Sequence, residues 1–302
     1  MTEQLCATAV RPAGYVGDPI RPPAEAGSII LQASIGCPHG RCSFCAAYRG
    51  VGFCVRSPDE FAAHVELVAS LGGRGGTRVF LADGDTMRLP ADRLFEFMER
   101  TKRVFPAARR FGVYAGARGI LEKSGDEMTR LKAAGLNTLY LGLESGSDDI
   151  LREMNKDATS GEMCEAVVAA QNAGLRVSVM VLLGLGGAGH SLDHAKATAA
   201  ALNRMQPRLL SVLTLMPVPG TPLWKRISEG SFALPDAPGM LWELRELVAR
   251  LEVNRTVFTA NHASSYLPLE GALPRDKERL LAELDAALAG SRRLVPEAWR
   301  GL

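Results

Sequence analysis

Short apolar runs alternate with longer helical patterns along the chain from about residue 29 onward. The apolar runs are rich in β-branched residues and have the length of strands, whereas the segments between them repeat apolar positions at the helical period. Such alternation is typical of β/α units arranged around a parallel sheet. Strands are therefore expected at 29–35, 78–82, 111–115, 138–143, 176–183 and 209–215.

Helices are expected between these strands, at 59–71, 91–104, 125–134, 148–173 with a break near 157–160, and 191–205. Gly72, Gly135 and Gly174 each follow a helical pattern and precede a strand, where helix-ending glycines belong. Six such units are too few for a closed eight-unit barrel, which needs about 250 residues. The pattern predicts an α/β fold, an incomplete (β/α)6 TIM-type barrel, with an open doubly wound sheet as the alternative.

Both ends of the chain depart from this alternation. Residues 1–28 are rich in Pro and Gly and are expected to form an N-terminal arm, so that 29–230 make up the partial barrel. Residues 231–302 are expected to form a C-terminal helical and loop extension that covers the barrel mouth. Helices are expected near 222–229, 237–251 and 274–289, and 258–269 is expected to be a loop or short strand.

Composition and charge exclude several classes of protein. The 302 residues are 47% hydrophobic, which can supply a substantial core. The 35 basic and 33 acidic residues are scattered, so no charge pattern for nucleic-acid binding stands out. The longest apolar stretches have strand length and the start has no secretory pattern, so no membrane segment is expected. We expect a cytoplasmic monomer.

Three of the six cysteines, Cys37, Cys42 and Cys45, fall within nine residues on a loop that follows the first strand. In a reducing compartment this usage argues against a disulfide framework. The close spacing lets one loop wrap a single metal centre. Iron-sulfur cubanes commonly have four cysteine ligands, so three would leave one iron open. A zinc site with His39 as fourth ligand, in a nonenzymatic module, is the alternative.

This loop resembles the cysteine motif of the radical S-adenosylmethionine (radical SAM) superfamily. The usual motif has three cysteines spaced by three and two residues, with an aromatic residue just before the last. Phe44 matches the aromatic residue and Cys42 and Cys45 match the second spacing, but four residues separate Cys37 from Cys42. The resemblance implies a [4Fe-4S] cluster on the three cysteines, S-adenosylmethionine as cosubstrate, and Phe44 beside the cofactor.

Further motifs stand at successive strand ends. Asp83-Gly84-Asp85 resembles the superfamily's element for the amino group of S-adenosylmethionine, where a carboxylate pairs with an ammonium, although Asp-Gly-Asp is also a common turn. Residues 141–148, with Glu144 and Ser145, closely resemble the element of the Elp3, MiaB and coproporphyrinogen-dehydrogenase-like branch. There the pair would hydrogen-bond the cosubstrate, or the segment could simply cap a helix.

Gly184 lies in a segment that resembles the glycine-rich element near adenine, and Pro217 lies in a turn that matches the closing element of the same branch. Arg118 follows the third strand, and its guanidinium could bind a carboxylate of the cofactor or the substrate. Alternatively, it could neutralise a carboxylate of the protein. Barrel enzymes build their sites from the loops after the strands, which is where all these motifs occur.

Substrate contacts are predicted on the polar and aromatic loop that carries Asn261, His262 and Tyr266. This tail resembles the end of an uncharacterised group of stand-alone radical SAM proteins, and His262 could also satisfy a backbone group instead. Cys54 occupies a position that is basic in related proteins. Its thiol is either incidental, a redox partner, or a soft ligand for trivalent arsenic. Cys164 is expected to be a buried residue with only a packing role.

The resemblance implies an enzyme that cleaves S-adenosylmethionine reductively and directs a 5′-deoxyadenosyl radical at a small-molecule substrate. A flavodoxin- or ferredoxin-type protein would donate the electron, under anaerobic conditions. The alternative is cleavage to 5′-methylthioadenosine, with 3-amino-3-carboxypropyl transfer to a soft nucleophile such as trivalent arsenic, as in arsinothricin-type biosynthesis. The sequence leaves the substrate unidentified.

Overall fold

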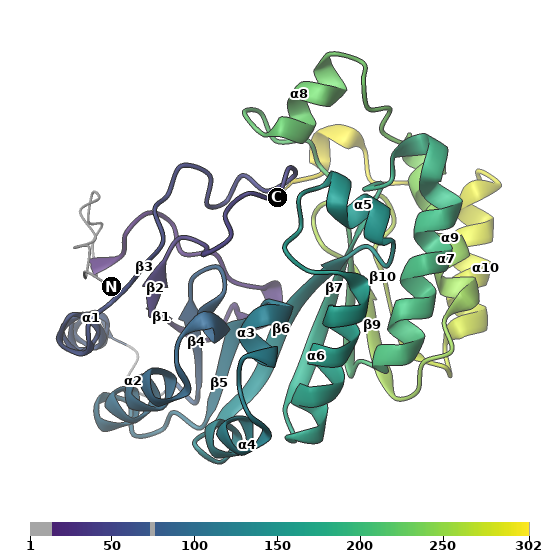
Figure 1. Cartoon of the computed structure of the whole chain (residues 1–302). Coiled ribbons are helices and arrows are strands. Elements are labelled where there is room, and N and C mark those ends of the chain that lie inside the picture. Colours follow the sequence, from purple (N-terminus) through teal and green to yellow (C-terminus); the bar gives the residue numbers. More distant parts are fainter. Residues whose placement is uncertain (1–13, 73–75, 302) are drawn as a thin grey trace. The chain divides into compact units, whose positions relative to one another are not determined.

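The computed structural model describes residues 14–72 and 76–301 (Figure 1). These residues form two compact units, each of which is described by itself. The first unit holds the described residues up to Gly40, with Ala47–Leu141 and Val168–Arg176, and the second holds Arg41–Ala46, Gly142–Val167 and Val177 onward. The chain therefore passes from the first unit to the second and back within the cysteine loop.

The main sheet has eight strands in the order β1-β4-β5-β6-β7-β8-β9-β10. Parallel pairing joins β1 to β4, β4 to β5, β5 to β6, β7 to β8 and β8 to β9, whereas β10 runs antiparallel to β9. The strands are β1 Ile29–Gln32, β4 Arg78–Ala82, β5 Arg110–Tyr114, β6 Leu136–Glu144, β7 Arg176–Leu183, β8 Leu209–Thr214, β9 Thr256–Ala260 and β10 Leu269–Leu273. The mostly parallel sheet and its open order confirm the predicted partial barrel.

Helices follow most of these strands (Figure 1). They are α1 Pro58–Ser70, α2 Ala91–Val104, α3 Ala117–Leu121, α4 Gly125–Ala133, α5 Asp148–Glu153, α6 Ser160–Asn172, α7 Gly187–Met205, α8 Pro222–Ser228, α9 Ala237–Arg250 and α10 Lys277–Leu288. Short 3-10 turns lie at η2 Pro23–Glu25, η3 Thr86–Arg88 and η4 Glu297–Trp299, and a small antiparallel sheet pairs β2 Ser34–Ile35 with β3 Cys54–Val55.

Local sequence explains where the helices of the first unit begin. Ser57 starts α1 with a capping box, because its side chain accepts from the Glu60 amide while the Glu60 side chain accepts from the Ser57 amide. Phe61 and Val65, one helical turn apart, are both buried, and the Phe61 ring stacks on Phe97 of α2 at 4.0 Å. The two helices are thereby packed side by side (Figure 1).

The second unit packs α7 beside α9 and α9 beside α10 (Figure 1). Asp236 caps α9 through the Gly239 amide, and Thr221 caps α8 through the Trp224 amide. A separate apolar cluster joins the ends of several elements and consists of Ile150, Met154, Leu185, Leu215, Leu223 and Phe232. Phe44 packs against this cluster, which fixes part of the cysteine loop within the second unit.

Several element boundaries differ from the sequence-based expectation. The predicted strand 29–35 is divided into β1 and β2, and α7 begins at Gly187, four residues before the predicted start at 191. The predicted break near 157–160 is confirmed, because α5 and α6 are separate helices. The segment 258–269 supplies most of β9 and the first residue of β10, which were not distinguishable from a loop because they have no regular apolar alternation.

No helix in the described ranges 14–72 and 76–301 is both long and apolar enough to span a membrane.

Candidate active site

The end of β4 supports the first cysteine within the first unit. The Gly84 amide donates to the Gly36 carbonyl at 3.1 Å, and this bond brings the β4 end against the start of the cysteine loop. A Cβ atom on Gly84 would lie 2.7 Å from the Cys37 Cβ and 2.9 Å from the Tyr48 ring. Only glycine fits there, so the predicted importance of Gly84 has a packing reason as well.

Asp83 and Asp85 on either side of Gly84 have different surroundings. Asp83 is buried and accepts from the Gln32 side chain at 2.9 Å, and its burial raises its pKa to about 6. Asp85 is also buried, and its Oδ1 accepts from the Gly116 amide after β5 at 2.9 Å. The two carboxylates therefore brace the strand ends, and Asp85 is the one that faces the loop after β5.

The other two cysteines lie on a turn that is anchored inside the second unit. The Cys45 amide donates to the Cys42 carbonyl at 3.2 Å, and the intervening Ser43 amide donates to the Met154 carbonyl at 2.8 Å. The Asn155 side chain donates to the Arg41 carbonyl at 2.9 Å. Two potential thiolate ligands are thus presented by one rigid turn at the end of α5.

The β6 strand ends in a strained turn centred on Glu144. The Ser145 amide donates to the Leu143 carbonyl at 2.7 Å, which closes a three-residue turn, and Glu144 has a φ of 62°. Residues with a Cβ rarely adopt this conformation, which occurs mostly where surrounding contacts or function require it. The turn directs the Glu144 carboxylate toward Lys156, whose Nζ lies 3.2 Å from Oε1.

Lys156 is a candidate site residue that the sequence analysis missed. It lies just past α5, where Asn155 has a left-handed φ of 54° and the Lys156 amide donates to the Leu151 carbonyl at 2.9 Å. The Lys156 and Glu144 side chains are 17% and 16% exposed, so their ion pair is largely buried. A Cβ on Gly142 would overlap the Glu144 carboxylate, so glycine is needed for the pair to form.

The charges at this end of the second unit influence one another. Burial alone lowers the pKa of Lys156, but the negative charges of Glu144 and Cys42 outweigh it and the net shift is upward. Burial raises the pKa of Cys42 to about 12, and Lys156 partly opposes that shift. Metal ligation requires the thiolate, so the nearby ammonium favours the form of Cys42 that binds iron.

The remaining predicted cofactor residues are found in varied surroundings. Gly184 is buried after β7 with a φ of 82°, and its amide donates to the Glu243 carboxylate at 2.7 Å. Ser145 is buried and accepts from the Ser147 amide at 3.1 Å. Pro217 is half-buried after β8, and Arg118 is exposed on α3. Their contacts with a cofactor stay predictions.

The loop of the predicted substrate residues is in contact with residues 297–301. The Tyr266 hydroxyl donates to Glu297 at 2.7 Å, and the Arg300 guanidinium lies 3.7 Å from the centre of the Tyr266 ring. Arg300 also donates to the Ser264 carbonyl at 2.8 Å, and the Gly301 amide donates to the Ala263 carbonyl at 3.2 Å. We call Glu297, Arg300 and Gly301 the C-terminal clasp.

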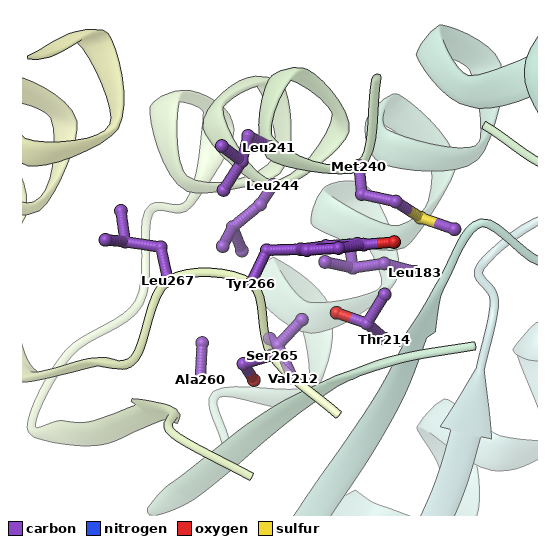
Figure 2. Close-up of a pocket in the computed structure, with 10 residues that line it drawn as sticks. All are labelled: Leu183, Val212, Thr214, Met240, Leu241, Leu244, Ala260, Ser265, Tyr266 and Leu267. Atoms are coloured by element: carbon purple, nitrogen blue, oxygen red, sulfur yellow. The ribbon is translucent and has the colours of Figure 1, made fainter. Parts of the chain in front are cut away.

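Tyr266 also lines a small pocket between α9 and the ends of β7, β8 and β9 (Figure 2). The pocket measures about 10 Å³, which is room for no more than one water molecule. Burial, followed by the bond to Glu297, raises the pKa of Tyr266 to about 12. These contacts give the ring a packing role, and a substrate contact for Tyr266 stays a prediction.

His262 and Asn261 lie on the same loop. His262 Nδ1 accepts from the Ser264 amide at 3.1 Å and lies 2.9 Å from the Ser264 hydroxyl, so the ring organises its own turn. Burial lowers the pKa of His262. The Asn261 side chain donates to Glu270 on β10 at 3.3 Å. His262 therefore satisfies a backbone group, as one of the two interpretations expected. A substrate contact for His262 stays a prediction.

Cys54 lies on β3, opposite Ile35, and is disulfide-bonded. This finding differs from the expectation that no disulfide would form, and it means that a soft-ligand role would first require reduction of the bond. Cys164 is buried as predicted, with its sulfur 3.6 Å from the Ala201 carbonyl. Cys6 lies outside the described residues.

Within 14–72 and 76–301, no three His, Cys, Asp or Glu side chains are gathered as a ready-made metal site. The donor set nevertheless fits a cluster, because Cys37, Cys42 and Cys45 are outside any disulfide and are partly exposed on one loop. The first is packed against Gly84 and the other two share one anchored turn. Soft thiolates on this loop suit iron-sulfur ligation, with the final ligand geometry set on metal binding.

Comparison with known proteins identifies the class. Residues 31–216 match the model of the radical SAM superfamily, which is more than half of the chain, and the chain belongs to that superfamily. It is an enzyme of a family that uses a [4Fe-4S] cluster and S-adenosylmethionine. The match ends after β8, so the last three helices and two strands lie outside it.

Individual relatives are distant. The chain is 23% identical over 172 residues to the heme chaperone HemW of Bacillus subtilis (strain 168), a match that covers 57% of this chain and 45% of HemW. Its fold resembles coproporphyrinogen III oxidase (HemN) from Escherichia coli, with a TM-score of 0.56, 18% identity, and 74% of this chain and 51% of that chain covered. Methylornithine synthase (PylB) gives a TM-score of 0.53 at 17% identity, covering 85% and 68%.

Proposed function

We propose that this enzyme cleaves S-adenosylmethionine reductively to methionine and a 5′-deoxyadenosyl radical, which abstracts a hydrogen atom from a small organic substrate and thereby becomes 5′-deoxyadenosine. When bound, the cluster supplies the electron for that cleavage. The observation that carries the proposal is the largely buried Glu144–Lys156 ion pair near Cys42. A carboxylate and an ammonium held together can bind the amino and carboxylate groups of S-adenosylmethionine.

In this proposal the chain's own residues bind and orient the cosubstrate. Cys37, Cys42 and Cys45 hold the cluster. Glu144 accepts hydrogen bonds from the amino group of the cosubstrate, and Lys156 donates to its carboxylate. Each member of the protein's own ion pair thereby exchanges its partner for a group of the same charge on the cosubstrate. This exchange avoids leaving a buried charge unpaired, which is the main cost of opening such a pair.

Further residues at the strand ends are part of the proposal. Asp85 offers a second carboxylate for the amino group. Gly84 and Gly184 are proposed as contacts through their main chain. Phe44, Arg118, Ser145 and Pro217 are further proposed contacts. Substrate-binding residues are sought on the loop of His262 and Tyr266, and an electron donor of flavodoxin or ferredoxin type is part of the proposal.

Transfer of a 3-amino-3-carboxypropyl group is not favoured by a specific observation. The alternative drew support from a free Cys54 thiol, and Cys54 is disulfide-bonded. The longer spacing between Cys37 and Cys42 does not by itself favour either outcome.

The products of reductive cleavage test the proposal. Protein reconstituted anaerobically should bind about four irons with sulfide, and a Cys42→Ala variant should not. Chromatography after reduction should then give 5′-deoxyadenosine. Methylthioadenosine as the main product, or one zinc without sulfide, would contradict the proposal.

A further inference from the structure

His194 on α7 is buried between two oxygen atoms of the second unit. Its Nδ1 lies 3.0 Å from Oε1 of Glu243 on α9, and its Nε2 lies 3.3 Å from the carbonyl oxygen of Glu144. The His194 and Glu243 side chains are 1% and 0% exposed. Oε1 of Glu243 also accepts from the Gly184 amide at 2.7 Å. One imidazole–carboxylate pair thus contacts the turns after both β6 and β7.

The hydrogen bonds of His194 fix the number of hydrogens that this pair carries. A carbonyl oxygen only accepts, so the bond to Glu144 requires a hydrogen on Nε2. The contact with Glu243 requires a second hydrogen, on Nδ1 or on the carboxyl group, because two bare acceptors repel each other. In both arrangements the pair has no net charge, which suits its burial, and His194 donates to the Glu144 carbonyl.

A second residue of α7 holds the other side of the same turn. Thr198 lies one helical turn after His194, on the same face of the helix, and its hydroxyl accepts from the Gly146 amide at 2.9 Å. Gly146 itself packs against the backbone of α7, where a Cβ would lie 2.6 Å from the Thr198 Cα. Helix α7 therefore fixes the Glu144 carbonyl and the Gly146 amide together.

Glu144 depends on such support because its left-handed backbone is unfavourable for a residue with a Cβ. We infer that His194 and Glu243 are positioning residues that hold the Glu144 turn in the conformation that presents its carboxylate to S-adenosylmethionine. The inference rests on the proposed function, in which Glu144 is a cosubstrate contact. Without the bond from His194, the turn relaxes and the carboxylate rotates away from Lys156.

The test uses three variants and one matched control. His194→Phe removes both bonds, and His194→Gln keeps a donor near the position of Nε2. Glu243→Gln keeps an oxygen acceptor for the Gly184 amide but removes the carboxylate that can balance a second hydrogen on His194. Asn203→Ala is the control. Asn203 also links α7 to the end of α9, since it donates to the Arg250 carbonyl at 2.9 Å and accepts from the Glu252 amide at 2.7 Å, both away from the turn.

Amide hydrogen exchange on the protein without cluster or cosubstrate gives the first readout. Peptides that cover residues 142–147 should exchange about tenfold faster in His194→Phe and Glu243→Gln than in wild type, because the turn opens locally. His194→Gln should stay within about threefold of wild type, and Asn203→Ala should leave this peptide unchanged. The second readout is the Kd of S-adenosylmethionine for cluster-loaded, unreduced protein, which should rise about tenfold in His194→Phe and not in Asn203→Ala.

The two readouts separate the inference from the proposed function. Equal exchange of 142–147 in His194→Phe and Asn203→Ala would overturn the inference, as would a His194→Gln variant that exchanges as fast as His194→Phe. Faster exchange with an unchanged Kd would support the positioning role and remove Glu144 from the cosubstrate site, which contradicts the proposed function instead. If His194→Phe does not fold, Glu243→Gln against Asn203→Ala decides in the same way.

Discussion

At the scale of single residues, Lys156 combines a fixed backbone position with an influence on two negative groups. Its ammonium lies 3.2 Å from Glu144, and its charge opposes the upward pKa shift of Cys42. If Lys156 binds the carboxylate of S-adenosylmethionine, Lys156→Met should raise the Kd roughly 10- to 100-fold, which is the usual worth of a hydrogen bond to a charged group. Equilibrium dialysis with cluster-loaded protein measures it.

Arg152→Met is the matched control for this prediction. Arg152 is a nearby cation on α5, paired with Asp149, but its side chain is 74% exposed. Exposed pairs contribute little and are screened, so the control should leave the Kd unchanged. Equal effects of the two substitutions would mean that net charge, and not a contact, governs affinity.

His262 predicts a pH effect on stability. Burial lowers its pKa below the ordinary value of about 6.5, so the unfolded chain binds the proton more readily than the folded one. The stability from neutral His262 is therefore present above about pH 6.5 and is lost as pH falls through the lower folded pKa. Protonation also removes the Nδ1 acceptor of the Ser264 amide.

Thermal unfolding at pH 7 and pH 5 measures this effect. The wild type should lose more stability on acidification than His262→Asn, which keeps an acceptor near the Ser264 amide without a group that titrates in this range. An identical loss in both proteins would show that other groups control the acid response.

Site residues could be predicted from the sequence where they lie in one motif, and were missed where they contact that motif from distant parts of the chain. Short contiguous motifs contain Cys42, Cys45, Gly84 and Glu144, so these residues could be recognised as candidates from the sequence. The partners of Glu144 come from elsewhere, since Lys156 follows a separate helix and His194 lies on α7. A lone Lys or His in a helical pattern carries no signal until packing brings it to the site.

At the scale of elements, the close packing of the β6 turn on α7 makes Gly146 irreplaceable. A Cβ there would overlap the Ala197 carbonyl, which is helix backbone and cannot move aside. Gly146→Ala should lower the free energy of unfolding by about 3 kcal/mol, near the upper end for overpacking. Denaturant unfolding measures the loss.

Gly161→Ala provides the comparison for this prediction. Gly161 lies in α6 of the same unit, and the nearest atom to its Cβ would be 3.9 Å away. The substitution should be neutral or stabilise the protein by about 0.4 to 1 kcal/mol through the unfolded state. Loss of stability in both variants would indicate that added volume is not the cause.

The elements of the partial barrel were largely predictable because the strands are apolar runs, and three of the helices before them are followed by glycine, at Gly72, Gly135 and Gly174. The short helix α3 and the strands β3 and β9 were not, because these short segments lack the continuous apolar run that marks strands such as β4 and β5. The sheet order follows from right-handed connection of consecutive β/α units, whereas the addition of β9 and β10 depends on pairing that the sequence pattern does not specify.

At the scale of the whole molecule, cosubstrate binding should stabilise the fold. A ligand that binds only the folded state at 100 times its Kd adds about 2.7 kcal/mol to the free energy of unfolding. The unfolding temperature of cluster-loaded protein should therefore rise with S-adenosylmethionine concentration in calorimetry. Cys42→Ala, which lacks the cluster, should not respond, and an equal rise in that variant would place the binding outside the proposed site.

The whole chain also divides into a part that matches the superfamily model and a part that lies outside that match. The family model ends at residue 216, and the chain spans 45% of HemW and 51% of HemN. Residues 217–301 supply α8, α9, β9, β10 and α10, together with the loop of His262 and Tyr266. Substrate choice is therefore to be sought in this part by mutagenesis, after the cleavage chemistry has been measured.

The C-terminal clasp has a consequence for engineering of this enzyme. Arg300 supports the Ser264 carbonyl and the Tyr266 ring, and Glu297 receives the Tyr266 hydroxyl, so the loop and the end of the chain form one module. A loop transplanted from a relative without its own terminal segment would lose these anchors. Specificity swaps should therefore exchange 261–268 and 297–301 together, so that the bond from the Gly301 amide to the Ala263 carbonyl is kept.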